Sequence, residues 1–199
     1  MRAKITALLL FSFASAAWAG DYDIDADHSS VSFKIRHLVG KVKGDFGKFK
    51  GGFTFEKGKP GDAKATALID AASINTGVKK RDDHLRSADF FDVKKFPELK
   101  FESTKYDASG DEGKLHGNLT IHGVTKPVVL EVKFNGEGKD PWGNMRAGFT
   151  GTTTVNRKDF GLGWNKALET GGLLVGDDVE IALEIEGIPA AGAGKKAKK

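Results

Sequence analysis

The residues of this chain that could carry out acid–base chemistry gather in the run Arg81-Asp82-Asp83-His84. A carboxylate can orient a histidine as a general base, and Ser87 lies three positions beyond His84, within reach on a helix. The sequence has no G-x-S-x-G turn, the motif that often presents a nucleophilic serine. We therefore interpret residues 79–87 as a short charged helix, with Asn75-Thr76 before it as a capping pair. We expect no catalysis.

Metal binding is the second chemistry that the five histidines suggest, but their spacing argues against it. The sequence contains neither an H-E-x-x-H nor an H-x-H pattern, and it has no cysteine. His116 and His122 fall on the polar parity of their segment, which predicts that both face outward. We expect surface or locally hydrogen-bonded histidines, with no metal and no cofactor.

A third group of residues suits the recognition of a polar head group. Arg157 and Asp159 lie two positions apart, so they could form a structural ion pair or contact a ligand. Trp164 lies in a Gly-rich segment and could plug a cavity or border its mouth. A cationic side chain such as Arg81 could neutralise an anionic head group there. The head-group candidates are Arg81, His84, Arg157 and Trp164.

Residues 115–134 predict the elements that must position these side chains. Leu115, Leu119 and Ile121 share one parity, and the apolar residues from Val128 to Phe134 share another. Because side chains alternate along a strand, each arm has one apolar face, which predicts an antiparallel hairpin. Pro127 lacks an N–H group, so we expect it in the connection or at a strand start.

The rest of the chain repeats this pattern at short spacing. Alternating segments with Gly-rich connections indicate an all-β sandwich or barrel, and the 26 glycines favour the sharp coiling of a barrel. The aromatic stretch 46–55 contains Gly51-Gly52, where we expect a bulge or turn. About eight strands would leave a lumen that holds one small ligand.

The two ends of the chain differ from this pattern. Arg2 and Lys4 precede the apolar run 5–13 and then Ala17-Trp18-Ala19, which predicts a signal peptide over residues 1–19 that is cleaved after Ala19. Residues 20–189 form one predicted domain, and residues 190–199 a disordered basic tail.

The basic charge of the chain resides at these ends. Leaving out the six basic residues there lowers the count of Lys+Arg from 31 to 25, against 27 Asp+Glu. The central part has no basic stripe with interleaved aromatic residues, so we expect no nucleic-acid partner and at most peripheral membrane contact.

Taken in order, the motifs of the chain resemble those of the YceI-like family of bacterial periplasmic proteins, over about residues 21–188. The resemblance rests on Asp27-His28-Ser29, Arg81-Asp82-Asp83-His84-Leu85, Asp89-Phe90-Phe91-Asp92, Phe96-Pro97, residues 117–128, Arg157-Lys158-Asp159-Phe160-Gly161 and Gly176-Asp177-Asp178-Val179. It implies an extended lipocalin-like antiparallel barrel that encloses a polyisoprenoid or isoprenoid-quinone-like lipid in the periplasm, and it leaves a homodimer open.

The apolar strand faces could meet in a solid core or line a tunnel, and the residues alone leave both open. The resemblance favours the tunnel, and hence a carrier that holds an apolar chain without covalent chemistry. The alternatives are a ligand-free structural or stress-response envelope barrel and, less favoured, an envelope hydrolase that uses His84. The lumen candidates are Phe33, Ile35, Phe49, Phe53, Phe101, Leu119, Ile121, Leu130, Val132, Phe149, Ile181 and Leu183.

Overall fold

A computed structural model describes residues 22–56, 60–169 and 171–190 of the chain. The predicted signal peptide, and the predicted tail beyond residue 190, lie outside the described residues. The described part is built from strands with one α-helix, α1 (Lys79–Arg86), which confirms the predicted all-β class and the short helix. The strands are β1 (Tyr22–Ile24), β2 (Ser30–His37), β3 (Gly40–Phe46), β4 (Phe49–Thr54), β5 (Lys64–Asp70), β6 (Ile74–Asn75), β7 (Glu98–Ser109), β8 (Glu112–Ile121), β9 (Val124–Lys139), β10 (Met145–Asn156) and β11 (Val175–Pro189).

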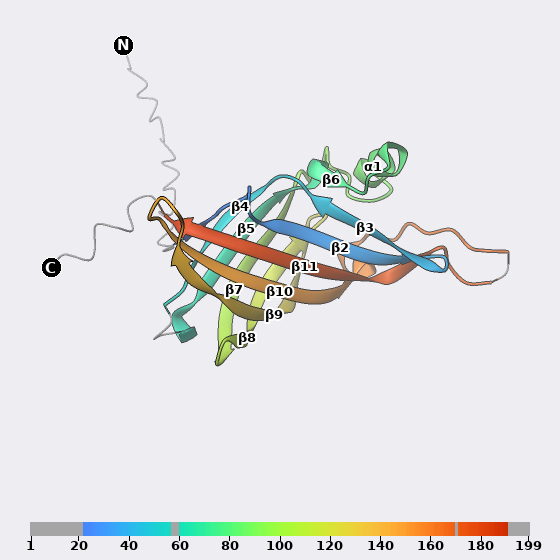
Figure 1. Ribbon diagram of the computed structural model, residues 1–199. Coiled ribbons are helices and arrows are strands. Elements are labelled where there is room, and N and C mark those ends of the chain that lie inside the picture. The colour runs from blue at the N-terminus through green and yellow to red at the C-terminus, as the bar shows by residue number, and fades with distance from the viewer. Residues whose placement is uncertain (1–21, 57–59, 170, 191–199) are drawn as a thin grey trace, which may run out of the picture.

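The strands close into an eight-stranded antiparallel barrel (Figure 1). The sheet order is β1-β4-β5-β7-β8-β9-β10-β11-β2-β3-β6, and β1 also pairs with β11, which completes the ring. β11 pairs with β1 near its end and with β2 along its first part, so β1 and β2 act as two halves of one barrel strand. Closure satisfies the strand edges that an open sheet would leave unpaired.

The predicted hairpin is confirmed as β8 and β9, and Leu115 lies opposite Leu130 as the apolar parity requires. Its turn is His122-Gly123, and both residues have a positive φ, 52° and 75°, as a two-residue type I′ turn demands. The placement of Pro127 was wrong, because it lies inside β9 opposite Asn118. β9 pairs with β10 only from Glu131 onward, so the proline occupies a stretch with a strand partner on one side only.

The break predicted at Gly51-Gly52 was also wrong. Both glycines lie inside β4, and the chain instead bends at Gly47 and Lys48, between β3 and β4. Gly51 is needed for close packing, since a Cβ there would lie 2.1 Å from the backbone oxygen of Thr66 on β5.

Several aromatic rings occupy the space next to glycines of other strands. The Phe101 ring covers Gly117, where a Cβ would come within 2.5 Å of it, and the Tyr106 ring covers Gly113 in the same way, at 2.6 Å. The same arrangement places Phe33 over Gly44 and Phe53 over Gly187. These positions require glycine, because a Cβ there would overlap the ring.

Helix α1 packs beside β6 at one end of the barrel. The predicted capping pair was wrong, because the cap residue is Val78, which makes no side-chain capping bond. Instead, a side chain of the helix bonds to the segment before it, because the buried carboxylate of Asp82 accepts a hydrogen bond from the backbone N–H of Thr76 at 2.9 Å. No helix in the described ranges is long and apolar enough to cross a membrane.

Candidate functional site: an apolar lumen

The barrel interior contains two adjoining cavities, of about 190 and 470 Å³. The smaller lies within the barrel proper, and the larger extends toward α1 and the loop that carries Trp164. Five side chains border both cavities, so the two cavities adjoin each other with these side chains between them. The shared residues are Phe33, Phe46, Leu99, Ile121 and Ile181.

All twelve predicted lumen residues border this space. Eleven line the smaller cavity, and Ile35 lines the larger one. Their inward orientation follows from strand parity, which therefore located the wall correctly. Whether they contact a ligand stays a prediction.

Sequence reasoning missed other wall residues. Phe46 lies at the end of β3 and Leu99 near the start of β7, where short alternating runs give a weak signal. Tyr106 was missed because its strand, β7, has a register shift between Ser103 and Lys105 that reverses the simple parity. Tyr106 is 7% exposed, and burial raises the pKa of its phenol.

An aromatic cluster borders the larger cavity next to α1. The His84 ring lies 5.1 Å from the Phe90 ring and 4.9 Å from that of Trp164, both edge to face, and Phe90 and Trp164 are 5.2 Å apart. Aromatic faces of this kind suit a planar or apolar group. The four head-group candidates all line this cavity, so the fold brings together residues that lie up to 83 positions apart in the sequence.

Arg157 has a structural function at this cavity. The side chain is 3% exposed, and its guanidinium donates to the carbonyls of Gly176 (2.8 Å), Trp164 (2.9 Å) and Leu162. Its carboxylate partner is Asp177 at 3.4 Å, so the predicted pairing with Asp159 was wrong. The 3₁₀ turn at residues 157–160 separates positions 157 and 159, which would share a side only in an extended chain. Arg157 therefore fixes the loop that holds Trp164.

The other polar candidates are also engaged with the protein. Arg81 donates to the hydroxyl of Thr76 at 2.7 Å and to its carbonyl at 2.9 Å. His84 Nε2 lies 2.8 Å from the Asp89 carboxylate. The Ser87 hydroxyl donates to the backbone carbonyl of His84 at 2.7 Å, and not to its imidazole. The geometry thus does not assemble a Ser–His nucleophile.

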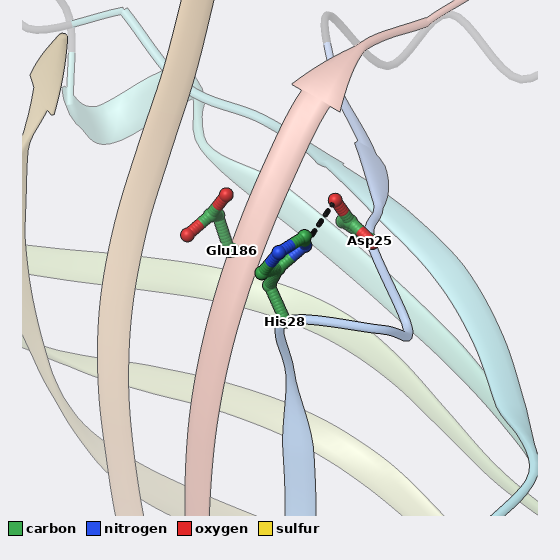
Figure 2. A group of neighbouring side chains, drawn as sticks. All are labelled: Asp25, His28 and Glu186. Atoms are coloured by element: carbon green, nitrogen blue, oxygen red, sulfur yellow. Dashed lines mark hydrogen bonds and ion pairs between the residues drawn. The ribbon is translucent and has the colours of Figure 1, made fainter. Parts of the chain in front are cut away.

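A separate polar group lies at the opposite end of β11, where Asp25, His28 and Glu186 approach one another (Figure 2). His28 Nδ1 lies 2.9 Å from Asp25, and this hydrogen bond raises the pKa of His28 and lowers that of Asp25. Arg146 is bonded to Asp25 and lies 3.1 Å from Glu186. The guanidinium therefore already neutralises the carboxylates, and we interpret the group as an ion-pair cluster that joins β1 to β10 and β11.

The predicted outward orientation of His116 is confirmed, and its ring pairs with Asp107 at 3.0 Å. His122 instead lies in the β8–β9 turn against Phe96, with ring centroids 4.4 Å apart.

The fold and the lumen define a lipocalin-like barrel with an apolar interior. The chain belongs to the YceI-like family, since the model of the YceI-like domain matches residues 22–187. A UPF0312 protein of Pseudomonas aeruginosa (strain LESB58) is 43% identical over 178 residues, covering 88% of this chain and 90% of its own length. A UPF0312 protein of Pseudomonas savastanoi pv. phaseolicola is 47% identical over 153 residues, covering 75% and 80%.

Solved structures share the fold. BcnA of Burkholderia cenocepacia superposes with a TM-score of 0.73 at 27% identity, covering 82% of this chain and 98% of its own. The YceI protein of Campylobacter jejuni gives 0.68 at 32% identity, covering 79% and 91%. A domain from Saccharophagus degradans described as polyisoprenoid-binding gives 0.61 at 16% identity, covering 85% and 98%, a likeness that concerns the fold alone.

Proposed function

We propose that the protein is an exported carrier that encloses one long apolar chain, a polyisoprenoid or isoprenoid-quinone-like lipid, in its lumen. The observation that carries this proposal is the pair of adjoining apolar cavities inside the barrel, which share five apolar wall residues. A solid core would leave no such space, because protein interiors normally pack to crystal-like density.

The energetics suit reversible binding of such a lipid. Burying an apolar chain gains about 0.8 kcal/mol for each methylene-sized group. Ordering that flexible chain opposes much of this gain. The net affinity can therefore favour both retention and release, and no reactive side chain is needed.

The mouth next to α1 suits the polar end of such a lipid. The guanidinium of Arg157 is used by protein carbonyls and Asp177, whereas the faces of Phe90 and Trp164 border the cavity. This arrangement favours a planar head group over an anionic one. A solved domain that shares the fold is described as polyisoprenoid-binding, which is consistent with an isoprenoid tail.

Native mass spectrometry of protein purified from its own cells, followed by organic extraction, tests the proposal. We expect a mass above that of the polypeptide and an extract that contains one long-chain isoprenoid. Protein that is always lipid-free, even after exposure to membrane extracts, would favour the ligand-free structural barrel.

Export is the second part of the proposal and rests on the sequence pattern at residues 1–19. We expect N-terminal sequencing of protein from the cell envelope to begin at Gly20. Recovery of Met1 at that terminus would contradict the export proposal without affecting the carrier proposal.

A further inference from the structure

Exposed apolar side chains concentrate around one end of the lumen. Among the described residues, six large hydrophobic side chains are exposed, and four of them lie at or beside the larger cavity. Leu38 and Val39 form the β2–β3 turn, Leu173 lies in the loop before β11, and Val78 lines the cavity itself. Val39 is 97% exposed. We name Leu38, Val39 and Leu173 the apolar tip.

The composition of this turn is not explained by folding. His37 pairs with Gly40, so Leu38 and Val39 are the two central residues of a tight hairpin. Leu38 has a φ of 53°, a conformation for which Asn or Gly is usual and Leu is unfavourable. Two apolar residues therefore occupy exposed positions where polar ones would fold more easily.

The tip is a built surface that continues into the lumen. The backbone N–H of Leu38 donates to Leu174 at 2.8 Å, and Arg36 donates to the carbonyls of Leu38 and Leu173, at 3.3 and 3.2 Å. His37 and Leu174, the chain neighbours of tip residues, line the larger cavity. In Figure 1 the β2–β3 hairpin and the loop before β11 extend together beyond the barrel, on the side away from the β9–β10 hairpin.

Basic side chains lie on the elements next to the tip or next to the larger cavity. Lys43 on β3, Lys166 in the loop and Lys80 at the cavity rim are exposed, and none forms an ion pair with another described residue. An apolar tip with cations on these adjoining elements complements the surface of an anionic bilayer, where apolar groups enter the interface and lysines meet phosphates.

We propose that the apolar tip docks this protein on anionic phospholipid bilayers, with the larger cavity open toward the lipid. The inference rests on the proposed carrier function and adds the partner of the carrier. An apolar chain could pass between membrane and lumen over the apolar tip and through the larger cavity without crossing bulk water. The solvation cost of exposing an isoprenoid chain to water gives the physical reason for such contact.

Vesicle flotation tests the docking alone. Wild type, Val39→Asp and the matched control Val129→Asp, which alters an exposed valine on β9, are prepared with identical N-termini. They are incubated with vesicles of phosphatidylethanolamine and phosphatidylglycerol, and separately with phosphatidylcholine vesicles. We expect Val39→Asp to weaken binding to the anionic vesicles about tenfold or more, the effect of losing one buried valine, and Val129→Asp to bind like wild type. Circular dichroism verifies that all three are folded.

Three results would overturn the proposal: no binding by wild type, equal binding by Val39→Asp, or equal binding to the uncharged vesicles. Uptake of a fluorescent polyprenyl alcohol from the same vesicles separates the two proposals. Binding that depends on Val39 without any uptake would retain the docking surface and contradict the carrier function. Uptake by Val39→Asp at the wild-type rate would retain the carrier and contradict docking.

Discussion

Arg157 illustrates how a residue chosen for ligand chemistry can instead hold the site together. Replacing it with Met removes the donors of three backbone carbonyls and leaves Asp177 without this partner. We expect a loss of about 3 kcal/mol in the free energy of unfolding, measured by urea denaturation. Asp159→Asn is the control and should behave like wild type, because the carboxylate partner of the buried Arg157 is Asp177. A large effect of Asp159→Asn would restore the pairing that the sequence suggested.

A pH-dependent contribution is also argued at the residue scale, from the hydrogen bond between His28 and Asp25. It raises the pKa of His28 above 6.5, with Glu186 adding to the shift and Arg146 opposing it. Because the pKa of His28 is raised in the folded protein, its stabilising contribution is complete below pH 6.5. This contribution is lost as the pH rises through the pKa of His28 in the folded protein. The pKa of Asp25 is lowered in the folded protein, so Asp25 makes a separate stabilising contribution. That contribution is present above pH 3.8 and is lost as the pH falls through the pKa of Asp25 in the folded protein. Both effects should be small, because the His28 side chain is 61% exposed and solvent screens the interaction.

The measurement is the melting temperature of wild type and His28→Asn over a pH series. At acidic pH values that are still above the range in which Asp25 protonates, the melting temperature of wild type should be higher than that of the variant. The difference should shrink toward alkaline pH. A difference that is constant over the series would show that the imidazolium is not involved.

At the scale of elements, glycines on one strand make room for aromatic rings from the next. Gly117→Ala would place a Cβ about 2.5 Å from the Phe101 ring and push the ring into the lumen. We expect a destabilisation of about 1–3 kcal/mol together with weaker lipid retention. Gly138→Ala on β9 is the control, since a Cβ there meets nothing within 4 Å. Restored stability and retention in Gly117→Ala combined with Phe101→Leu would confirm the steric cause, and unaltered behaviour of Gly117→Ala alone would contradict it.

At the scale of the whole molecule, the two adjoining cavities can be polarised or blocked. Leu130→Asp places a carboxylate in the wall, where water in an empty lumen can hydrate it but an apolar chain cannot lie. Ile181→Trp adds bulk at a side chain that borders both cavities. We expect both variants to keep their circular dichroism spectra and to lose co-purified lipid. Unfolding of both variants, with lipid never found in wild type, would indicate a filled barrel.

The sequence by itself determined the wall of the barrel. A period of two along each strand assigns every side chain to one face, so all twelve lumen residues were found without coordinates. The β8–β9 hairpin and the helix at residues 79–86 followed from equally local patterns. Local patterns failed where a long-range partner decides the outcome. Pro127 is accommodated because its stretch of β9 has a strand partner on one side only, and Gly51 is required by the approach of β5.

Only the tertiary structure decided whether the wall encloses a cavity, because the direction of each ring depends on which glycine lies opposite it on another strand. It likewise assigned Arg157 to Asp177, twenty positions away, and gathered Arg81, His84, Arg157 and Trp164 around one cavity. Parity specifies the face on which a side chain lies, whereas strand register and closure specify its neighbours. Those are properties of the whole barrel, set by residues far apart in the chain.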